Sequence, residues 1–167
     1  MGRRHESAGR LNVIGDVTPS PDEALPPAPG DEALAGFSAR CNAIEEAYEF
    51  MLAYAAQGLP DEKGSASGSQ IRDFLRKCDA ALTGLGDAMT GCVRRLEIQT
   101  SAPYDAMIDV VKDDVRKAQA KVQLVLAQPS IGSQLVDNLN ASIHLRAVLT
   151  DLFLLDEVLK LQVRTKH

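Results

Sequence analysis

The sequence predicts an all-α protein, an up-and-down antiparallel four-helix bundle with a disordered N-terminal tail. Apolar residues recur at alternating spacings of three and four along most of the chain, which is typical of amphipathic helices. Aromatic residues make up only 4% of the chain and Trp is absent, which favours helices because strands draw on aromatic and β-branched residues. The connections between the helical segments are short, so neighbouring helices should run antiparallel.

The composition is that of one globular domain with room for a tail. At 167 residues the chain can bury a sizeable core, and its 45% hydrophobic and 25% charged residues are ordinary for a globular protein. The net charge of −5 argues against a nucleic-acid partner, which needs a basic face. No apolar run approaches the roughly 20 residues that a membrane span needs. Near the N-terminus, no apolar run reaches the about 7 residues that a secretory signal needs. We therefore expect a cytoplasmic protein without a membrane span.

Residues 1–29 are predicted to form a disordered, proline-rich tail, because prolines at this density remove amide donors and fix φ. Within the tail, the stretch GRLNVIGDV at residues 9–17 is a short apolar patch, and it loosely resembles the short peptides that load cargo proteins into bacterial protein shells. A tethered apolar peptide suits docking into a groove on a partner. A passive leader is the alternative. The expected docking residues are Leu11, Val13, Ile14 and Val17.

Residues 30–165 are predicted to form the bundle. The first helix is expected over residues 31–57, with Asp31 as its N-cap and Gly58 as its C-cap. The second helix is expected over residues 69–98, after a Gly/Ser-rich connection. The apolar seam of the first helix is Leu34, Phe37, Cys41, Ile44, Tyr48, Met51 and Ala55, and that of the second is Leu75, Cys78, Leu82, Leu85, Met89, Cys92 and Leu96.

The third helix follows a connection at about residues 99–102, where Ser101 can cap it and Pro103 lies in the tolerant first turn. The fourth helix is expected after a connection at about residues 127–130, capped by Ser130, and continues to about Val163. The seam of the third helix is Tyr104, Ile108, Val111, Val115, Ala118, Val122 and Val125.

The fourth helix carries more apolar surface than a bundle helix can bury. Leu152, Phe153, Leu154 and Leu155 are consecutive, and at about 100° per residue they point around nearly the whole helix. Each helix of a bundle keeps an outer face, so we expect a second subunit to cover this segment. The alternative is that the tail or an irregular neighbour packs over it.

The second helix offers a smooth strip of small residues. We expect bulky side chains of the fourth helix, from the same or another subunit, to lie against it, because glycine costs a helix roughly 1 kcal/mol and is tolerated where a backbone approaches closely. The alternative is a helix broken or kinked near residues 84–86. The strip consists of Ala81, Gly84, Ala88 and Gly91.

The first helix contains an acidic cluster at Glu45, Glu46 and Glu49. This E-E-x-x-E pattern resembles the metal-binding helix of MazG-type all-α nucleoside triphosphate pyrophosphatases. The resemblance implies a dimeric bundle that hydrolyses nucleotides with Mg²⁺, completed by an E-x-x-D pair on the next helix. The next helix offers Asp73 and Asp87 as the Asp of such a pair. In both places the Glu is missing, because Gln70 and Gly84 stand three residues before them.

The seam also places Glu46 and Glu49 on the outward side of the first helix, and only Glu45 borders it. A Mg²⁺ site should gather carboxylates from facing helices. We therefore interpret the cluster as a solvated helix face and expect no metal and no cofactor. The alternative is a metal site, for which these three glutamates are the candidate ligands.

Five other polar or reactive positions have interpretations of their own. His144 is expected at a half-buried boundary, where it donates one hydrogen bond. Cys41, Cys78 and Cys92 occupy seam positions, where a thiol behaves as a small hydrophobe. Asp156 lies on the apolar stripe of the fourth helix, can pair with Lys160 at i+4, and should set the register of the bundle or of subunit pairing.

The sequence as a whole favours a non-enzymatic adaptor that acts through protein–protein contacts. We expect a homodimer with a flexible N-terminal docking arm, and no small-molecule ligand is indicated. The alternative function is that of a Mg²⁺-dependent, MazG-like nucleoside triphosphate pyrophosphatase.

Overall fold

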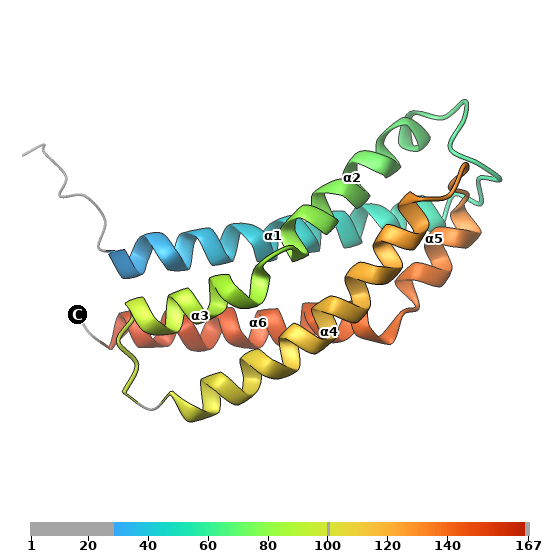
Figure 1. The fold of residues 1–167 in the computed structure, drawn as a ribbon. Helices are drawn as coiled ribbons and strands as arrows, with labels where there is room; N and C mark the ends of the chain where they lie inside the picture. The colour runs from blue at the N-terminus through green and yellow to red at the C-terminus, as the bar shows by residue number, and fades with distance from the viewer. Residues whose placement is uncertain (1–28, 100, 166–167) are drawn as a thin grey trace, which may run out of the picture.

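The computed structural model describes residues 29–99 and 101–165, and in these ranges the chain is all-helical, with six helices and no strand. α1 and α4 run in one direction, and the other helices run in the opposite direction (Figure 1). The predicted all-α class is confirmed, whereas residues 1–28 of the expected tail lie outside the described residues. The helices are α1 (Pro29–Ala55), α2 (Ala66–Leu82), α3 (Leu85–Arg95), α4 (Ala102–Leu126), α5 (Ser133–Asn140) and α6 (Ile143–Arg164).

The prediction of a single helix over residues 69–98 is wrong, because the helix is interrupted between α2 and α3. Gly84 has a φ of 71°, a left-handed conformation that costs other residues roughly 1–2 kcal/mol. Arg40 of α1 donates hydrogen bonds to the carbonyl oxygens of Ala81, at 3.1 Å, and Thr83, at 2.7 Å. The structure therefore adopts the alternative, a break near residues 84–86, and α1 supplies partners for the carbonyl groups at the end of α2.

The predicted fourth helix is also divided, into α5 and α6. α5 begins at Ser133 with Gly132 as its N-cap, so the expected capping by Ser130 is wrong. The backbone of Ser142 is extended, with φ −60° and ψ 118°. Asn140 and Ser142 lie at the point where the helix is interrupted, and their buried side-chain polar atoms make no hydrogen bond within the described part of the chain.

α1 and α4 match the predicted first and third helices closely. α1 begins at Pro29, slightly before the expected N-cap Asp31, and Gly58 follows its end with a φ of 66°. α4 has Pro103 in its first turn as expected, although its N-cap residue Ser101 makes no side-chain capping bond.

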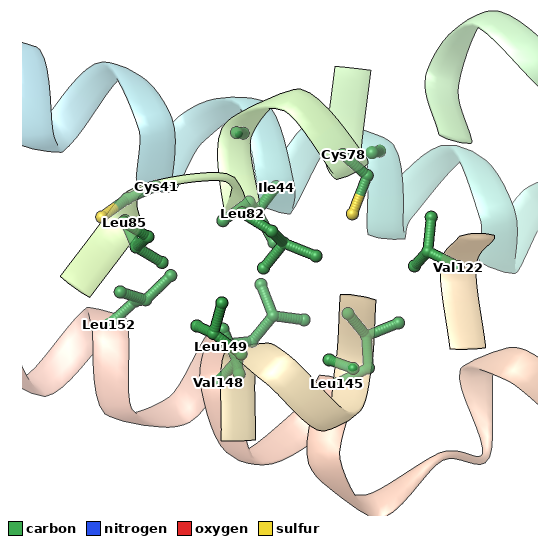
Figure 2. Packing of buried hydrophobic residues seen from close by; sticks show 14 of the residues in the cluster. Cys41, Ile44, Cys78, Leu82, Leu85, Val122, Leu145, Val148, Leu149 and Leu152 are labelled. Atoms are coloured by element: carbon green, nitrogen blue, oxygen red, sulfur yellow. The ribbon is translucent and has the colours of Figure 1, made fainter. Parts of the chain in front are cut away.

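The hydrophobic core lies where the helices face one another. α1 and α4 each pack against α2, α3, α5 and α6. Figure 2 shows Ile44 of α1, Leu82 and Leu85 on either side of the break, and Leu145 and Leu149 of α6 meeting in this core. The predicted seams are largely confirmed, since every seam residue of the second helix is buried. Ala47 and Tyr54 of α1 are also buried, although neither was expected in the seam.

A polar network ties the end of α1 and the first half of α2 to the segment that runs from the end of α4 to the start of α5. The Tyr54 hydroxyl donates to the Ile131 carbonyl oxygen at 2.6 Å, and the Ser133 hydroxyl donates to the Tyr54 carbonyl oxygen at 2.6 Å. Arg72 of α2 donates to the carbonyl oxygens of Leu126, at 3.0 Å, and Gln128, at 2.9 Å. The two Arg72 bonds satisfy carbonyl groups at the end of α4 that have no helical partners.

Candidate interaction surface

The four consecutive apolar residues of α6 divide into two buried and two exposed side chains. Leu152 and Leu155 are 1% and 5% exposed, whereas Phe153 and Leu154 remain 47% and 57% exposed. The protein's own chain therefore covers one side of this segment and leaves the other side uncovered. The cover of the exposed side by a second subunit stays a prediction.

The exposed side chains of α6 lie on a single face. At about 100° per residue, all exposed positions between Ile143 and Arg164 fall within an arc of roughly 100°. Four of these eight positions carry large apolar side chains, which is a high share for a solvated face. We call this set the α6 face: Ile143, Arg146, Thr150, Phe153, Leu154, Glu157, Leu161 and Arg164.

A groove runs along each flank of the α6 face. The first, between α1 and α6, has a volume of about 340 Å³ and is lined by Phe153 and Arg146 together with Glu45, Glu49 and Leu52 of α1. The second, between α4 and α6, has a volume of about 270 Å³. Its lining is almost wholly apolar: Pro103, Tyr104, Met107, Leu154, Leu155 and Val158.

The strip of small residues predicted on the second helix is interrupted by the break. Ala81 is buried at the end of α2, whereas Gly84 is exposed between α2 and α3. Ala88 and Gly91 are partly exposed on α3. A Cβ atom added at Gly91 would meet nothing within 4 Å, so no side chain of this subunit lies against that position.

The acidic cluster of α1 has the orientation that its seam predicts. Glu45 is half-buried, and Glu46 and Glu49 are exposed. Glu45 and Glu49 line the groove beside α6, whereas Glu46 is not part of its lining. Among the residues that the structure describes, no group of three or more His, Cys, Asp or Glu side chains is placed to hold a metal ion.

His144 has the environment predicted for it. It is half-buried on α6, and its Nδ1 atom lies 2.7 Å from a carboxylate oxygen of Asp114 on α4. Burial, with the neighbouring Asp114 charge as a second cause, raises the pKa of the Asp151 carboxyl, which lies about two turns further along α6. The contact between His144 and Asp114 connects α6 to α4.

Asp156 pairs with Lys160 as predicted, and it also has a partner that the sequence did not indicate. The Ser38 hydroxyl of α1 donates to Asp156 Oδ1 at 2.7 Å, while Lys160 donates to Oδ2. A serine on a half-buried helix flank is ordinary, so sequence reasoning missed this contact. The contact supports the interpretation that Asp156 sets the register between helices.

The three cysteines are free and buried, as their seam positions predict. Burial raises the pKa of the Cys41 and Cys78 thiols to about 12 and also raises the pKa of Cys92. The Cys92 thiol donates to the Ala33 carbonyl oxygen at 3.1 Å. Thiols with such pKa values are poor nucleophiles at neutral pH, because only the thiolate reacts readily.

The predicted docking residues Leu11, Val13, Ile14 and Val17 lie outside the described residues. Within the described helices, none combines the length and hydropathy that crossing a membrane requires. No protein-family model, curated protein or solved structure matches the chain. Function must therefore be inferred from the surfaces of the molecule itself.

Proposed function

We propose that this protein is a non-enzymatic adaptor that acts through protein–protein contacts, and that it self-associates as a homodimer. In this proposal the six helices form four rods, α1, α2–α3, α4 and α5–α6, arranged as an up-and-down antiparallel four-helix bundle. The bundle is a rigid support for the α6 face. In the same proposal, the segment before α1 docks onto a further partner through Leu11, Val13, Ile14 and Val17.

The observation that carries this proposal is the exposure of Phe153 and Leu154 in the middle of α6. Burying a Phe or Leu side chain contributes about 1.5–3 kcal/mol relative to leaving it in water. Single exposed apolar residues need no explanation, but several on one helix face mark an interaction site. Ile143 and Leu161 extend the same face toward both ends of α6.

The grooves beside the α6 face add to its capacity for a protein partner. Interface cores favour aromatic and aliphatic side chains with charged groups at the rim. Phe153 and Leu154 each line one groove, and the charged residues Glu45, Glu49 and Arg146 also line the first. A helical partner laid against α6 can therefore bury apolar surface on both flanks.

The self-association is tested by light scattering on the full chain. We expect a dimer for the wild type and a shift toward monomer for Leu154→Lys, because a charge in the buried part of an interface is costly. The matched control is Leu124→Lys, since Leu124 is 64% exposed on α4, outside the α6 face. A monomeric wild type at high micromolar concentration, or an unaltered dimer in Leu154→Lys, contradicts the proposal.

The docking arm is tested separately by comparing affinity capture with the full chain and with a variant lacking residues 1–29. We expect the shortened chain to keep its helicity and melting temperature and to lose the captured partner. Substituting Leu11 and Ile14 together with Ser in the full chain should cause the same loss. Equal capture by all three proteins would assign recruitment to the bundle alone.

The alternative, Mg²⁺-dependent nucleotide pyrophosphatase activity, is supported by the position of Glu45 and Glu49 beside one groove. It is separated from the adaptor hypothesis by measuring pyrophosphate release from nucleoside triphosphates with Mg²⁺. We expect no release above a protein-free control. Release that disappears in Glu46→Ala would replace the adaptor hypothesis with the enzymatic one.

A further inference from the structure

We propose that two copies of this chain pair through the α6 face in antiparallel orientation, about a two-fold axis that passes close to the level of Leu152. This inference rests on the proposed self-association and specifies its geometry. A two-fold interface uses the same patch on both subunits, so each residue must be opposite a residue it complements. The α6 face meets this requirement in one orientation.

The apolar residues of the face are arranged symmetrically about Leu152. Ile143 precedes Leu152 by as many residues as Leu161 follows it. At about 100° per residue the two side chains project in nearly the same direction. In an antiparallel pair, Ile143 of one copy therefore lies opposite Leu161 of the second copy. This contact occurs twice, once on each side of the axis.

The centre of the face is apolar as well. Phe153 and Leu154 lie next to the level of the axis, and Thr150 lies on the other side of that level. In the antiparallel arrangement, Leu154 of one copy is opposite Thr150 of the second copy, and the two Phe153 rings approach each other. The exposed aromatic rings then take the central position where the anchors of protein interfaces are concentrated.

The charges on the face distinguish the two possible orientations. Arg146 and Glu157 are both exposed and lie at nearly equal distances on either side of the axis level. Antiparallel pairing brings Arg146 of each copy close to Glu157 of the other. A parallel two-fold pair instead aligns Arg146 with Arg146 and Glu157 with Glu157, and these like charges repel.

The flanks of α6 supply the remaining contact area. A stable interface buries about 800 Å² on each partner, and α6, with 22 residues, is only about 33 Å long at its helical rise. The rims of the two grooves add surface, with Leu52 on the α1 side and Tyr104 and Met107 on the α4 side. The two-fold rotation brings the α1 side of one copy against the α1 side of the second copy, and the α4 side against the α4 side.

The charge pair is tested by analytical ultracentrifugation of Arg146→Glu, Glu157→Arg and the double variant. We expect each single reversal to raise the dimer Kd by about tenfold, because an attractive pair becomes repulsive twice per dimer. The double variant should return the Kd to within about threefold of the wild type. Arg76→Glu on α2 is the matched control and should leave the Kd unchanged, since Arg76 is exposed and pairs only within its own helix.

The register is tested by mild oxidation of cysteine variants. The three native thiols are buried, so they should not form disulfide bonds between copies in this experiment. We expect Ile143→Cys combined with Leu161→Cys to give a covalent dimer, and Ile143→Cys alone to give none. A covalent dimer from Ile143→Cys alone indicates a parallel pair and overturns the inference.

The outcomes separate this inference from the function it rests on. A monomeric wild type contradicts both. A wild-type dimer that Leu154→Lys disrupts, but that neither charge reversal weakens and the paired cysteines do not link, leaves self-association in place and overturns the antiparallel pairing. Circular dichroism should confirm full helicity in every variant, because all the substituted residues are exposed.

Discussion

The Asp156 carboxylate on α6 accepts a hydrogen bond from the Ser38 hydroxyl on α1 at 2.7 Å. The second oxygen of the same carboxylate pairs with Lys160 one turn along α6. The side chain of Asp156 is mostly buried, so the helix-to-helix contact is made in a partly desolvated place. Hydrogen bonds to charged groups are worth more than neutral ones in such an environment.

Replacing Asp156 should therefore destabilise the protein. We expect Asp156→Ala to lower the free energy of unfolding by about 1–3 kcal/mol, because Ser38 loses its acceptor and Lys160 its counter-ion. Urea denaturation measures this change. The matched control is Asp109→Ala on the exposed side of α4, which should change the stability by less than about 0.5 kcal/mol. Equal effects in the two variants would mean that the contact does not hold α1 and α6 together.

Gly84 and Gly91 should respond in opposite directions to alanine. Gly84→Ala places a Cβ on a left-handed residue, and we expect a loss of about 1–2 kcal/mol. Gly91 lies inside α3, where a Cβ meets nothing within 4 Å, so Gly91→Ala should raise the stability by about 0.5–1 kcal/mol. Thermal melts of the two variants make the comparison. A stabilising Gly84→Ala would indicate one continuous helix across the break.

Arg72 should be far more important for stability than its neighbour Arg76. The Arg72 guanidinium bonds to two carbonyl oxygens at the end of α4 and to Glu62 at 2.7 Å. We expect Arg72→Leu to cost about 2 kcal/mol, because these partners lose a charged donor. Arg76→Leu removes one exposed ion pair and should cost less than about 1 kcal/mol. Similar midpoints of urea unfolding for the two variants would contradict this assignment.

The buried thiols should be protected in the native protein. Burial raises the pKa of Cys41 and Cys78 from 9.0 to about 12, so both thiols stay protonated at pH 8. We expect a thiol-specific chromogenic disulfide to label the native chain slowly and all three cysteines at once after unfolding. Fast labelling of the native protein at pH 8 would show that the core opens readily.

The same shifts give the sign of a pH dependence. A thiol whose pKa is raised on folding stays protonated in the folded chain while the unfolded chain ionises. The folded state then holds more protons, and stability falls as the pH rises from about 9 toward 12. Unfolding midpoints measured across pH 8–11 should therefore decline. The decline should be shallower in a Cys41→Val, Cys78→Val double variant, and an identical slope would contradict this cause.

The helical class and most of the core could be predicted because both depend on local spacing. A stripe at intervals of three and four selects the residues that a helix can bury together, and Phe37, Ile44 and Met51 are buried as that stripe requires. The same geometry predicted that Glu46 and Glu49 would be exposed. The pairing of Asp156 with Lys160 was also predictable, since both lie on adjacent turns of one helix.

The candidate surface could be predicted only in part. The run of four apolar residues indicated that α6 has more apolar surface than the bundle buries. The helical period alone does not show which side of α6 faces the core. Arg146 and Glu157 were not singled out, because charged residues on a helix are usually a solvated face. The proposal that they face each other between two copies depends on the exposed positions of α6, which only the structure gives.

The sequence by itself determined the helical segments, their amphipathic faces and the burial of the cysteines, because these follow from a period of 3.6 residues along a single chain. The tertiary structure decided where two of the helices break and which flank of α6 meets water. Arg40 of α1 bonds to the carbonyl oxygens at the end of α2. The packing of α6 against its neighbours buries Leu152 and Leu155 and leaves Phe153 and Leu154 about half exposed. Both outcomes depend on partners far away in the chain, which local spacing does not specify.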